Sequence, residues 1–422
     1  MKEEYLSPKY TWLMLAVVLL ATLMDGLDGS IVTVANPDIG KTFGVDTATV
    51  SWVVSVYFIV LAGSLIFFAK IADNHGVRNV MIAGLVLFTV GSALCGLENG
   101  FPVLIASRAL QGFGAAMMAA TGPMCCVKYL PPQKLAFGLA VITVGSSVGF
   151  AIGPGLGGLI VEYLSWHWVF FINIPLGIIT ILLAAVALPR EERLVRTSID
   201  WPGAALLATA IVFGIMAVEM LSYADRRTFS AVSGLACLAL LALFAKHEGR
   251  TARPLLNLQL FRNLSFSGIF LCLLSINLAY MGLWYLIPFY GEINLGLSSA
   301  EIGSFLLVSA VVTACLGMPM ARLSDRYGRR QFCIAAAVCT GAAFILSALF
   351  ASSMSLPLLA VIMFLMGLGW AFVGGPMASW LVEHATGPDR DMASSLINEA
   401  YYTGGGIGTA LFAALFAVTS GS

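Results

Sequence analysis

About thirteen apolar runs follow one another along this 422-residue chain, and no other feature limits its fold as strongly. A run of about 20 apolar residues is long enough to cross a bilayer as a helix. Only 10% of the residues are charged, whereas soluble domains carry about 25%. The chain is therefore predicted to be an all-α polytopic membrane protein with about 13 spans. The runs fall at about 10–33, 49–69, 79–97, 101–122, 136–161, 168–188, 203–221, 230–245, 264–290, 300–320, 332–351, 355–380 and 393–418.

The lysines and arginines between these runs are sorted by side. If the N-terminus lies in the cytoplasm, about eighteen fall in cytoplasmic segments, and only Lys41, Arg226 and Arg227 fall outside. Positive charge is retained on the cytoplasmic side of membrane proteins. This bias predicts a multi-pass protein of the cell (plasma) membrane with a cytoplasmic N-terminus.

Two acids interrupt the first run. Asp25 and Asp28 stand within Tyr10–Val34, where each costs about 2.5–3.5 kcal/mol on insertion scales. Residues three apart share one face of a helix, and neighbouring carboxylates resist ionising together. The pair suits a proton carrier or a cation site. The alternative is a structural role, as a helix cap or a backbone partner inside the bundle.

Two ten-residue segments of the chain are similar to each other. Residues 69–78 (AKIADNHGVR) align without gaps to 321–330 (ARLSDRYGRR). The repeat predicts two halves of six spans with a two-helix insertion, as in major facilitator transporters. We expect an N-terminal half at 1–190, the insertion with its flanking loops at 191–262, and a C-terminal half at 263–422. The last helix of that half is expected to be absent, since it would follow Ser422.

Several stretches of the sequence have the pattern of known motifs. They are LDGSIVTVANP (27–37), AKIADNHGVR (69–78), RALQG (108–112), GFAIGPGLGG (149–158) and WHWVFFINIPLG (166–177). In these stretches the chain resembles the fourteen-span drug:proton antiporters of the major facilitator superfamily, and the resemblance covers almost its whole length. Ser30, Thr33 and Asn36 depart from the family's first-span signature, and Ala69 and His75 depart from its loop motif.

The repeated loop is expected to act as a gate. Its acids and bases are predicted to hold the two halves together on the cytoplasmic side and to favour an outward-open state. The alternative is that these charges only set the topology. The gate residues are Asp73, Gly76, Arg78, Asp325, Arg326, Gly328 and Arg329.

Arg108 lies within the fourth run and needs a partner there. Asp25 or Asp28 is the expected partner, and proton binding would release the pair. A purely structural ion pair would have the same sequence pattern. The fifth run contains the residues of the antiporter motif, which are expected to pack closely and to bend a helix at a seam between the halves. They are Gly149, Gly153, Pro154, Gly157 and Gly158.

Glu399 is the second acid of interest. It stands where the family usually has threonine, and Tyr401 stands where the family has arginine. Gaining an acid and an aromatic ring favours a cationic, planar substrate. Glu399 could instead be solvated at the cytoplasmic surface. Aromatic residues of the ninth run could line a cavity or belong to the interfacial belt, and Glu219 is expected at a helix end.

The sequence as a whole predicts a proton-coupled, secondary-active exporter of lipophilic, cationic small molecules that works by alternating access. Asp25, Asp28, Arg108 and Glu399 are its predicted coupling and substrate residues. We expect a monomer in the bilayer that uses protons as coupling ions, without cofactor, metal or nucleic acid. One alternative is transport of an anionic metabolite anchored by Arg108. A membrane receptor or enzyme is a remote one, since no HExxH or GxSxG motif is present.

Overall fold

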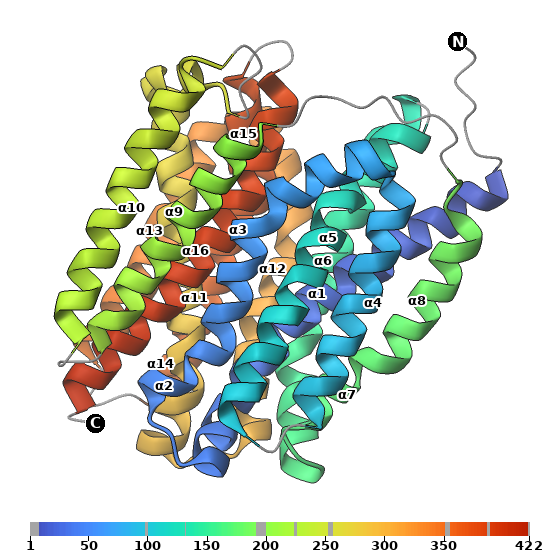
Figure 1. The fold of residues 1–422 in the computed structure, drawn as a ribbon. Helices are drawn as coiled ribbons and strands as arrows, with labels where there is room; N and C mark the ends of the chain where they lie inside the picture. The colour runs from blue at the N-terminus through green and yellow to red at the C-terminus, as the bar shows by residue number, and fades with distance from the viewer. Residues whose placement is uncertain are drawn as a thin grey trace.

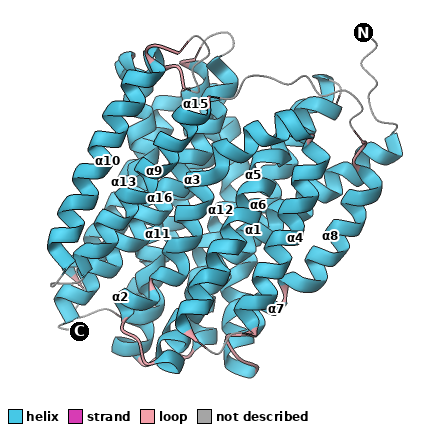
Figure 2. Cartoon of the chain, in the orientation of Figure 1, coloured by secondary structure: helices cyan, strands magenta, loops and turns pink. Residues whose placement is uncertain are grey.

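The computed structural model describes residues 8–97, 100–130, 132–190, 200–222, 226–251, 256–350, 355–385 and 389–420. Helices account for nearly all of these residues, and no strand occurs among them (Figure 2). The prediction of an all-α polytopic fold is therefore confirmed. The α-helices are α1 (Pro8–Phe43), α2 (Thr47–Val50), α3 (Trp52–His75), α4 (Val77–Gly96), α5 (Phe101–Tyr129), α6 (Pro132–Tyr163), α7 (Trp168–Phe171), α8 (Asn173–Ala187), α9 (Trp201–Glu219), α10 (Arg227–Glu248), α11 (Leu264–Leu295), α12 (Ser299–Tyr327), α13 (Arg329–Leu349), α14 (Leu356–Phe372), α15 (Ala378–Glu383) and α16 (Asp389–Ser420).

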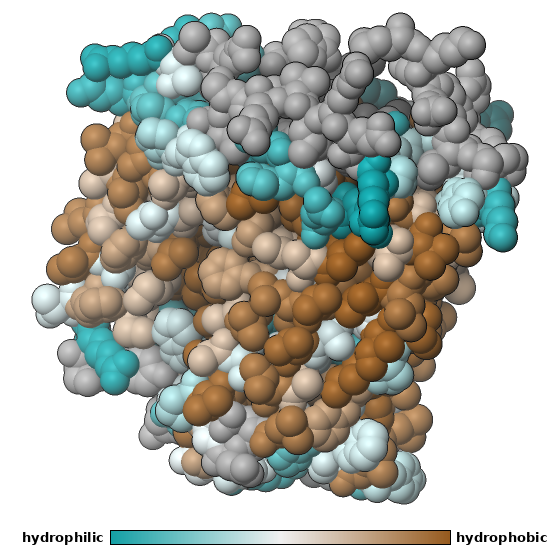
Figure 3. All heavy atoms as spheres, turned by 45° about the vertical axis from the view of Figure 1, so that its right-hand side comes forward, coloured by the Kyte–Doolittle hydropathy of each residue, from teal (hydrophilic) through white to brown (hydrophobic). Residues whose placement is uncertain are grey.

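Within the described residues, 11 helices are long and apolar enough to cross a membrane. The other two predicted spans are helical as well: α14 has 17 residues and α16 has 32. Apolar side chains form a belt around the molecule below a polar end, as Figure 3 shows for one face. This belt is the surface that lipid would cover.

The backbone repeats where the sequence repeats. Gly76, between α3 and α4, and Gly328, between α12 and α13, both have φ 93°. Gly44 and Gly296, which follow α1 and α11, both have φ 65°. Residues with a side chain rarely adopt positive φ, so glycine fits these turns. The gap-free register of the loop motif thus extends back to the first helix of each half.

Equivalent helices also pack alike. α1 lies against α6 as α11 lies against α16, and α4 lies against α5 as α13 lies against α14 (Figure 1). Across the molecule, α6 contacts α12 and α3 contacts α16. The inserted pair α9–α10 packs against α3 and α16 through α9. The division into domains at residues 190 and 262 stays a prediction.

A polar cluster lies at the end of the inserted pair where α9 begins and α10 ends. Asp200 caps α9 by accepting from the Gly203 amide at 3.1 Å, and its Oδ1 lies 2.7 Å from His247 Nε2 on α10. Glu248 accepts from the Leu256 amide at 3.1 Å and so ties α10 to the segment before α11. Burial acts to raise the pKa of Asp200, but the hydrogen bonds from His247 and Gly203 outweigh it, and the pKa of Asp200 is lowered overall.

Asp200→Asn tests this cluster. A lowered pKa means that the folded state favours the ionised carboxylate, so Asp200 stabilises the protein above its ordinary pKa of about 4 and loses that effect as the pH falls through the folded value. Asparagine caps helices as well as aspartate does, so only the charge effect is removed. We expect a loss of less than about 1 kcal/mol at neutral pH that begins to shrink as the pH falls to about 4 and vanishes only below the lower, folded-state pKa. Thermal unfolding at several pH values measures it, and a loss that does not change with pH would contradict this account.

Candidate functional site

Asp28 lies at the centre of a buried polar cluster. Its side chain is completely buried, and that of Arg108 is 1% exposed. Arg108 Nη1 donates to Asp28 Oδ2 at 2.6 Å. Gln111 Nε2 and Asn173 Nδ2 donate to Asp28 Oδ1 at 2.7 and 3.2 Å. Of the two acids expected as partners for Arg108, Asp28 is therefore the one it contacts.

The rest of the Arg108 side chain is also held by the protein. Its Nε donates to the Val53 carbonyl at 2.8 Å, and Nη1 donates to Gln111 Oε1 at 2.6 Å. The guanidinium also lies 4.4 Å from the centre of the Tyr57 ring. These partners come from α3 and α5, so the cluster joins α1, α3, α5 and α8. Asp28 and Arg108 are thus each held by several hydrogen bonds, whereas Asn173 Oδ1 is buried without a partner among the described residues.

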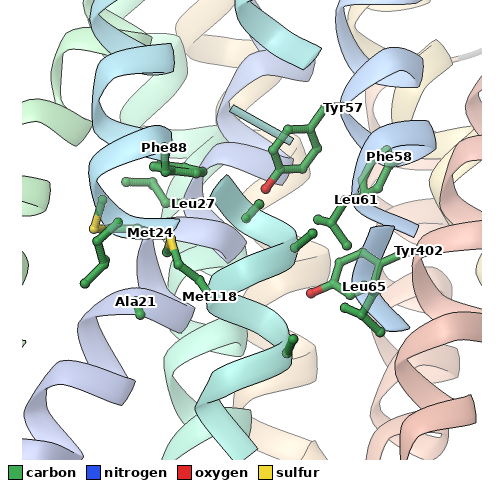
Figure 4. Packing of buried hydrophobic residues seen from close by; sticks show 14 of the residues in the cluster. Ala21, Met24, Leu27, Tyr57, Phe58, Leu61, Leu65, Phe88, Met118 and Tyr402 are labelled. Atoms are coloured by element: carbon green, nitrogen blue, oxygen red, sulfur yellow. The ribbon is translucent and has the colours of Figure 1, made fainter. Parts of the chain in front are cut away.

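Asp25 has a different environment. It is half-buried on the same helix. Tyr57 Oη on α3 donates to Asp25 Oδ1 at 2.7 Å, and Tyr402 Oη on α16 donates to Oδ2 at 2.9 Å. Figure 4 shows Tyr57, Phe58 and Tyr402 gathered where α3 and α16 come together. Asp25 is thus a carboxylate shared between the first helices of the chain and the last one described.

The two acids, which the sequence analysis treats as one pair, therefore have different partners. Asp28 has a basic partner, whereas no ion pair of Asp25 is found within the described parts of the chain. A spacing of three residues leaves an angle of about 60° between two side chains on a helix. That angle is enough to direct one of them into the bundle of α1, α5 and α8 and the other towards α16.

Glu399 on α16 is buried, with 8% of its surface exposed. Thr403 Oγ1 donates to its Oε1 at 2.8 Å. The other oxygen, Oε2, is buried and has no partner among the described residues. The alternative of a solvated residue at the membrane surface is therefore wrong, and Glu399 presents an unused acceptor one helical turn from Tyr402.

A stack of aromatic rings joins α11, α14 and α16. Tyr280 stacks on Trp370 at 4.3 Å between ring centres and on Trp284 at 5.3 Å. Tyr401 meets Trp370 at 5.7 Å. Tyr280 and Trp284 are buried, so neither belongs to an interfacial belt.

Three arginines of the repeated loops have contacts that the structure describes. Arg78 Nη2 donates to the Ala185 carbonyl at the end of α8, at 2.8 Å. Arg329 pairs with Glu383 of α15 at 2.7 Å, and Arg326 lies over the Tyr327 ring at 5.5 Å. These contacts lie within one half each, and the predicted cytoplasmic gate between the halves stays a prediction. The side chains of Asp73 and Asp325 lie outside what the structure describes.

The opposite face is closed across the halves. Lys41 on α1 forms an ion pair with Glu292 on α11. Ser299 Oγ donates to Asp38 Oδ2 at 3.4 Å, and the Ala300 amide donates to Glu162 Oε2 at 3.1 Å. These contacts join the two halves on this face.

The antiporter motif forms the seam expected of it. A Cβ at Gly149, Gly153 or Gly157 would collide with α1, at Leu23, Ser30 and Ile31 respectively. A Cβ at Gly158 would collide with the backbone of Ser299 on α12. A Cβ at Gly303 of α12 would likewise collide with the Pro154 carbonyl. α6 therefore contacts α1 on one side and the second half on the other.

Four partners of the acids were not assigned from sequence. Gln111 and Asn173 stand inside the motifs RALQG and INIPLG, so a polar residue within an apolar run was the available signal. Tyr57 and Tyr402 gave only a weak signal, because tyrosines in spans are common near interfaces. Within the described residues, no group of three or more His, Cys, Asp or Glu is placed to hold a metal ion.

Comparison with known proteins agrees with this geometry. The family model described as Major Facilitator Superfamily matches residues 18–409. The riboflavin transporter RibZ of Clostridioides difficile is 28% identical over 97% of this chain and 89% of its own length. The putative multidrug resistance protein MdtD of Escherichia coli is 32% identical over 78% of this chain and 70% of its own length. In fold, the chain resembles a bacterial homologue of the human lysosomal transporter Spinster in an inward-facing, unoccupied conformation, with TM-score 0.65, 17% identity, and coverage of 96% and 82% of the two chains.

Proposed function

The chain belongs to the Major Facilitator Superfamily, and from this membership we propose that it is a proton-coupled exporter of lipophilic, cationic small molecules. It is a multi-pass membrane transporter. Its proposed cycle is alternating access, in which two halves rock around a site near the middle of the membrane. The relative named as a multidrug resistance protein supports the direction and the substrate class.

The position of Asp25 carries the proposal. It is half-buried and is held by Tyr57 from one half and by Tyr402 from α16. A carboxylate that is removed from water without a cation loses much of its solvation free energy. A bound proton removes that charge. Asp25 is therefore the proposed coupling acid, and Asp28 with Arg108 is the rigid support beside it.

Protonation of Asp25 changes its hydrogen bonds. An ionised carboxylate accepts at both oxygens, and hydrogen bonds to a charged acceptor are roughly twice as strong as neutral ones. A protonated carboxyl becomes a donor at one oxygen. The phenol on that side must then turn its own hydrogen away. The contact between α1 and α16 through Tyr402 weakens, which favours separation of the halves on the closed face.

The substrate proposal depends on Glu399 and on the aromatic rings that meet α16. Glu399 Oε2 has no partner among the described residues, and Tyr401, two residues further along α16, meets Trp370 at 5.7 Å between ring centres. A planar cation would pair with the carboxylate and stack on the rings. Arg108, the expected anchor of an anionic substrate, is instead buried against Asp28.

A second candidate is transport of an uncharged planar ring system. The stack of Tyr280, Trp284 and Trp370 would accept such a molecule whatever its charge. The relative named as a riboflavin transporter favours this candidate. Riboflavin is therefore a second substrate in the assay.

Asp25→Asn tests the coupling role. Purified protein in liposomes with an acidic interior should accumulate a planar cationic dye, and the variant should lose this proton-driven uptake by about tenfold or more, a factor that corresponds to 1.4 kcal/mol. Exchange of labelled for unlabelled dye, without a pH gradient, should persist because the site for the dye is intact. Tyr402→Phe keeps the ring and removes the hydroxyl, so it should shift the pH dependence of uptake.

Tyr163→Phe is the matched control, since Tyr163 is 73% exposed. Its uptake should equal that of the parent protein. Full proton-driven uptake by Asp25→Asn would refute the coupling role. Uptake of riboflavin but not of the cationic dye would favour the second candidate.

A further inference from the structure

Glu219, the last residue of α9, forms a second buried carboxyl site far along the chain from the α1 acids. Glu219 lies at a helix end, as predicted, but its side chain is completely buried. Ser51 Oγ hydrogen-bonds with Glu219 Oε1, and Ser55 Oγ donates to Oε2 at 3.1 Å. Both serines lie at the start of α3. Glu219 thus joins the inserted pair to the first half.

No charged group neutralises this carboxyl within the described residues. Asp46 lies near this end of the helices but accepts from the Thr49 amide as the cap of α2. Arg226 and Arg227, at the start of α10, are exposed. From α16, the apolar Ala410 packs with Ile215 of α9. Removing an ionised carboxylate from water into such surroundings costs several kcal/mol.

The hydrogen bonds of the Ser51 hydroxyl give an independent reason to expect a proton on Glu219. Ser51 Oγ also lies 2.6 Å from the Ala48 carbonyl oxygen, which can only accept. A hydroxyl has one hydrogen, so Ser51 cannot donate to both Ala48 and Glu219. If Glu219 carries a proton on Oε1, all bonds are satisfied: Ser55 donates to Oε2, Oε1 donates to Ser51, and Ser51 donates to Ala48.

We propose that Glu219 is a proton-binding site at the joint between α9 and α3, separate from Asp25, and that it holds its proton while the Lys41–Glu292 face is closed. Loss of this proton leaves a buried charge between two serines. Water must then enter between α9 and α3, or the helices must separate. The inserted pair is thereby coupled by protonation to a helix that forms the boundary between the halves.

Infrared difference spectroscopy on the full chain in liposomes tests this site. The C=O stretch of a protonated carboxylic acid is separate from that of a carboxylate and of an amide. The spectrum at neutral pH should lose one carboxylic acid band in Glu219→Gln. Glu301→Gln changes an exposed glutamate on the same face and should lose none. An unchanged spectrum in Glu219→Gln would mean that Glu219 is ionised, and would overturn the proposal.

Ser55→Ala provides a test that leaves the acid in place. Removing the donor to Oε2 should shift the Glu219 band to higher frequency, because a C=O bond without a hydrogen-bond donor is stiffer. No shift would also overturn the proposal. The coupling role of Asp25 is judged separately, since Asp25→Asn should lose proton-driven uptake and keep the Glu219 band.

Discussion

Replacing Arg108 by methionine is expected to lower the free energy of unfolding by about 3–5 kcal/mol. Asp28, completely buried, would lose its only basic partner within the described residues. The hydrogen bonds from Gln111 and Asn173 would remain, but they do not neutralise the charge. Thermal unfolding of the purified protein in detergent should show this loss as a large fall in the unfolding temperature.

A second substitution in the same molecule separates charge from packing. Asp28→Asn together with Arg108→Met removes both charges and should recover most of the lost stability, because a buried pair contributes little net free energy. Arg227→Met, at an exposed arginine, should leave the unfolding temperature unchanged. If Arg108→Met alone unfolds at the same temperature as the parent protein, Asp28 is not the charged centre of this cluster.

Gly158→Ala is expected to destabilise the closed face by about 1–3 kcal/mol, the usual cost of overpacking. The new methyl group would collide with the Ser299 backbone of α12, which cannot rotate away. The clash exists only while α6 and α12 are together. The population of the closed arrangement should therefore fall by about tenfold for each 1.4 kcal/mol.

Carbodiimide coupling measures this population with native side chains. The reagent joins the Lys41 amine to the Glu292 carboxylate as an amide when they are in contact. The yield of this linkage, read by mass spectrometry of peptides, should fall in Gly158→Ala. Gly155→Ala is the control, since its Cβ would meet Leu307 at an ordinary 3.5 Å. Equal yields in both variants would show that the seam does not depend on Gly158.

Much of the fold could be predicted because lipid imposes simple rules. Apolar length located the helices, and the loop repeat aligned the halves down to the turns at Gly76 and Gly328. The need of an arginine within a span for an acidic partner predicted that Arg108 lies near the α1 acids, and it contacts Asp28. These features depend on composition and local spacing, which the sequence contains directly.

The division of roles between Asp25 and Asp28 could not be predicted. It depends on the angle between adjacent turns of α1 and on Tyr402, which is 377 residues away from Asp25. The burial of Glu219 could not be predicted either. The sequence indicated a helix end, but burial and the pairing with Ser51 and Ser55 come from the packing of α9 against α3. Long-range contacts of this kind have no local pattern.

The inserted pair has a consequence for the lipids in which the protein works. α9 has 19 residues, so it is about 28 Å long, close to the roughly 30 Å of a bilayer's hydrocarbon core. Only 22% of its apolar window is buried inside the protein, so one side of the helix is open to acyl chains. Mismatch between helix and membrane costs fractions of a kcal/mol per Å. Acyl-chain length should therefore affect the position of α9 directly. Because Glu219 connects α9 to α3, membrane thickness should also affect the packing of α3.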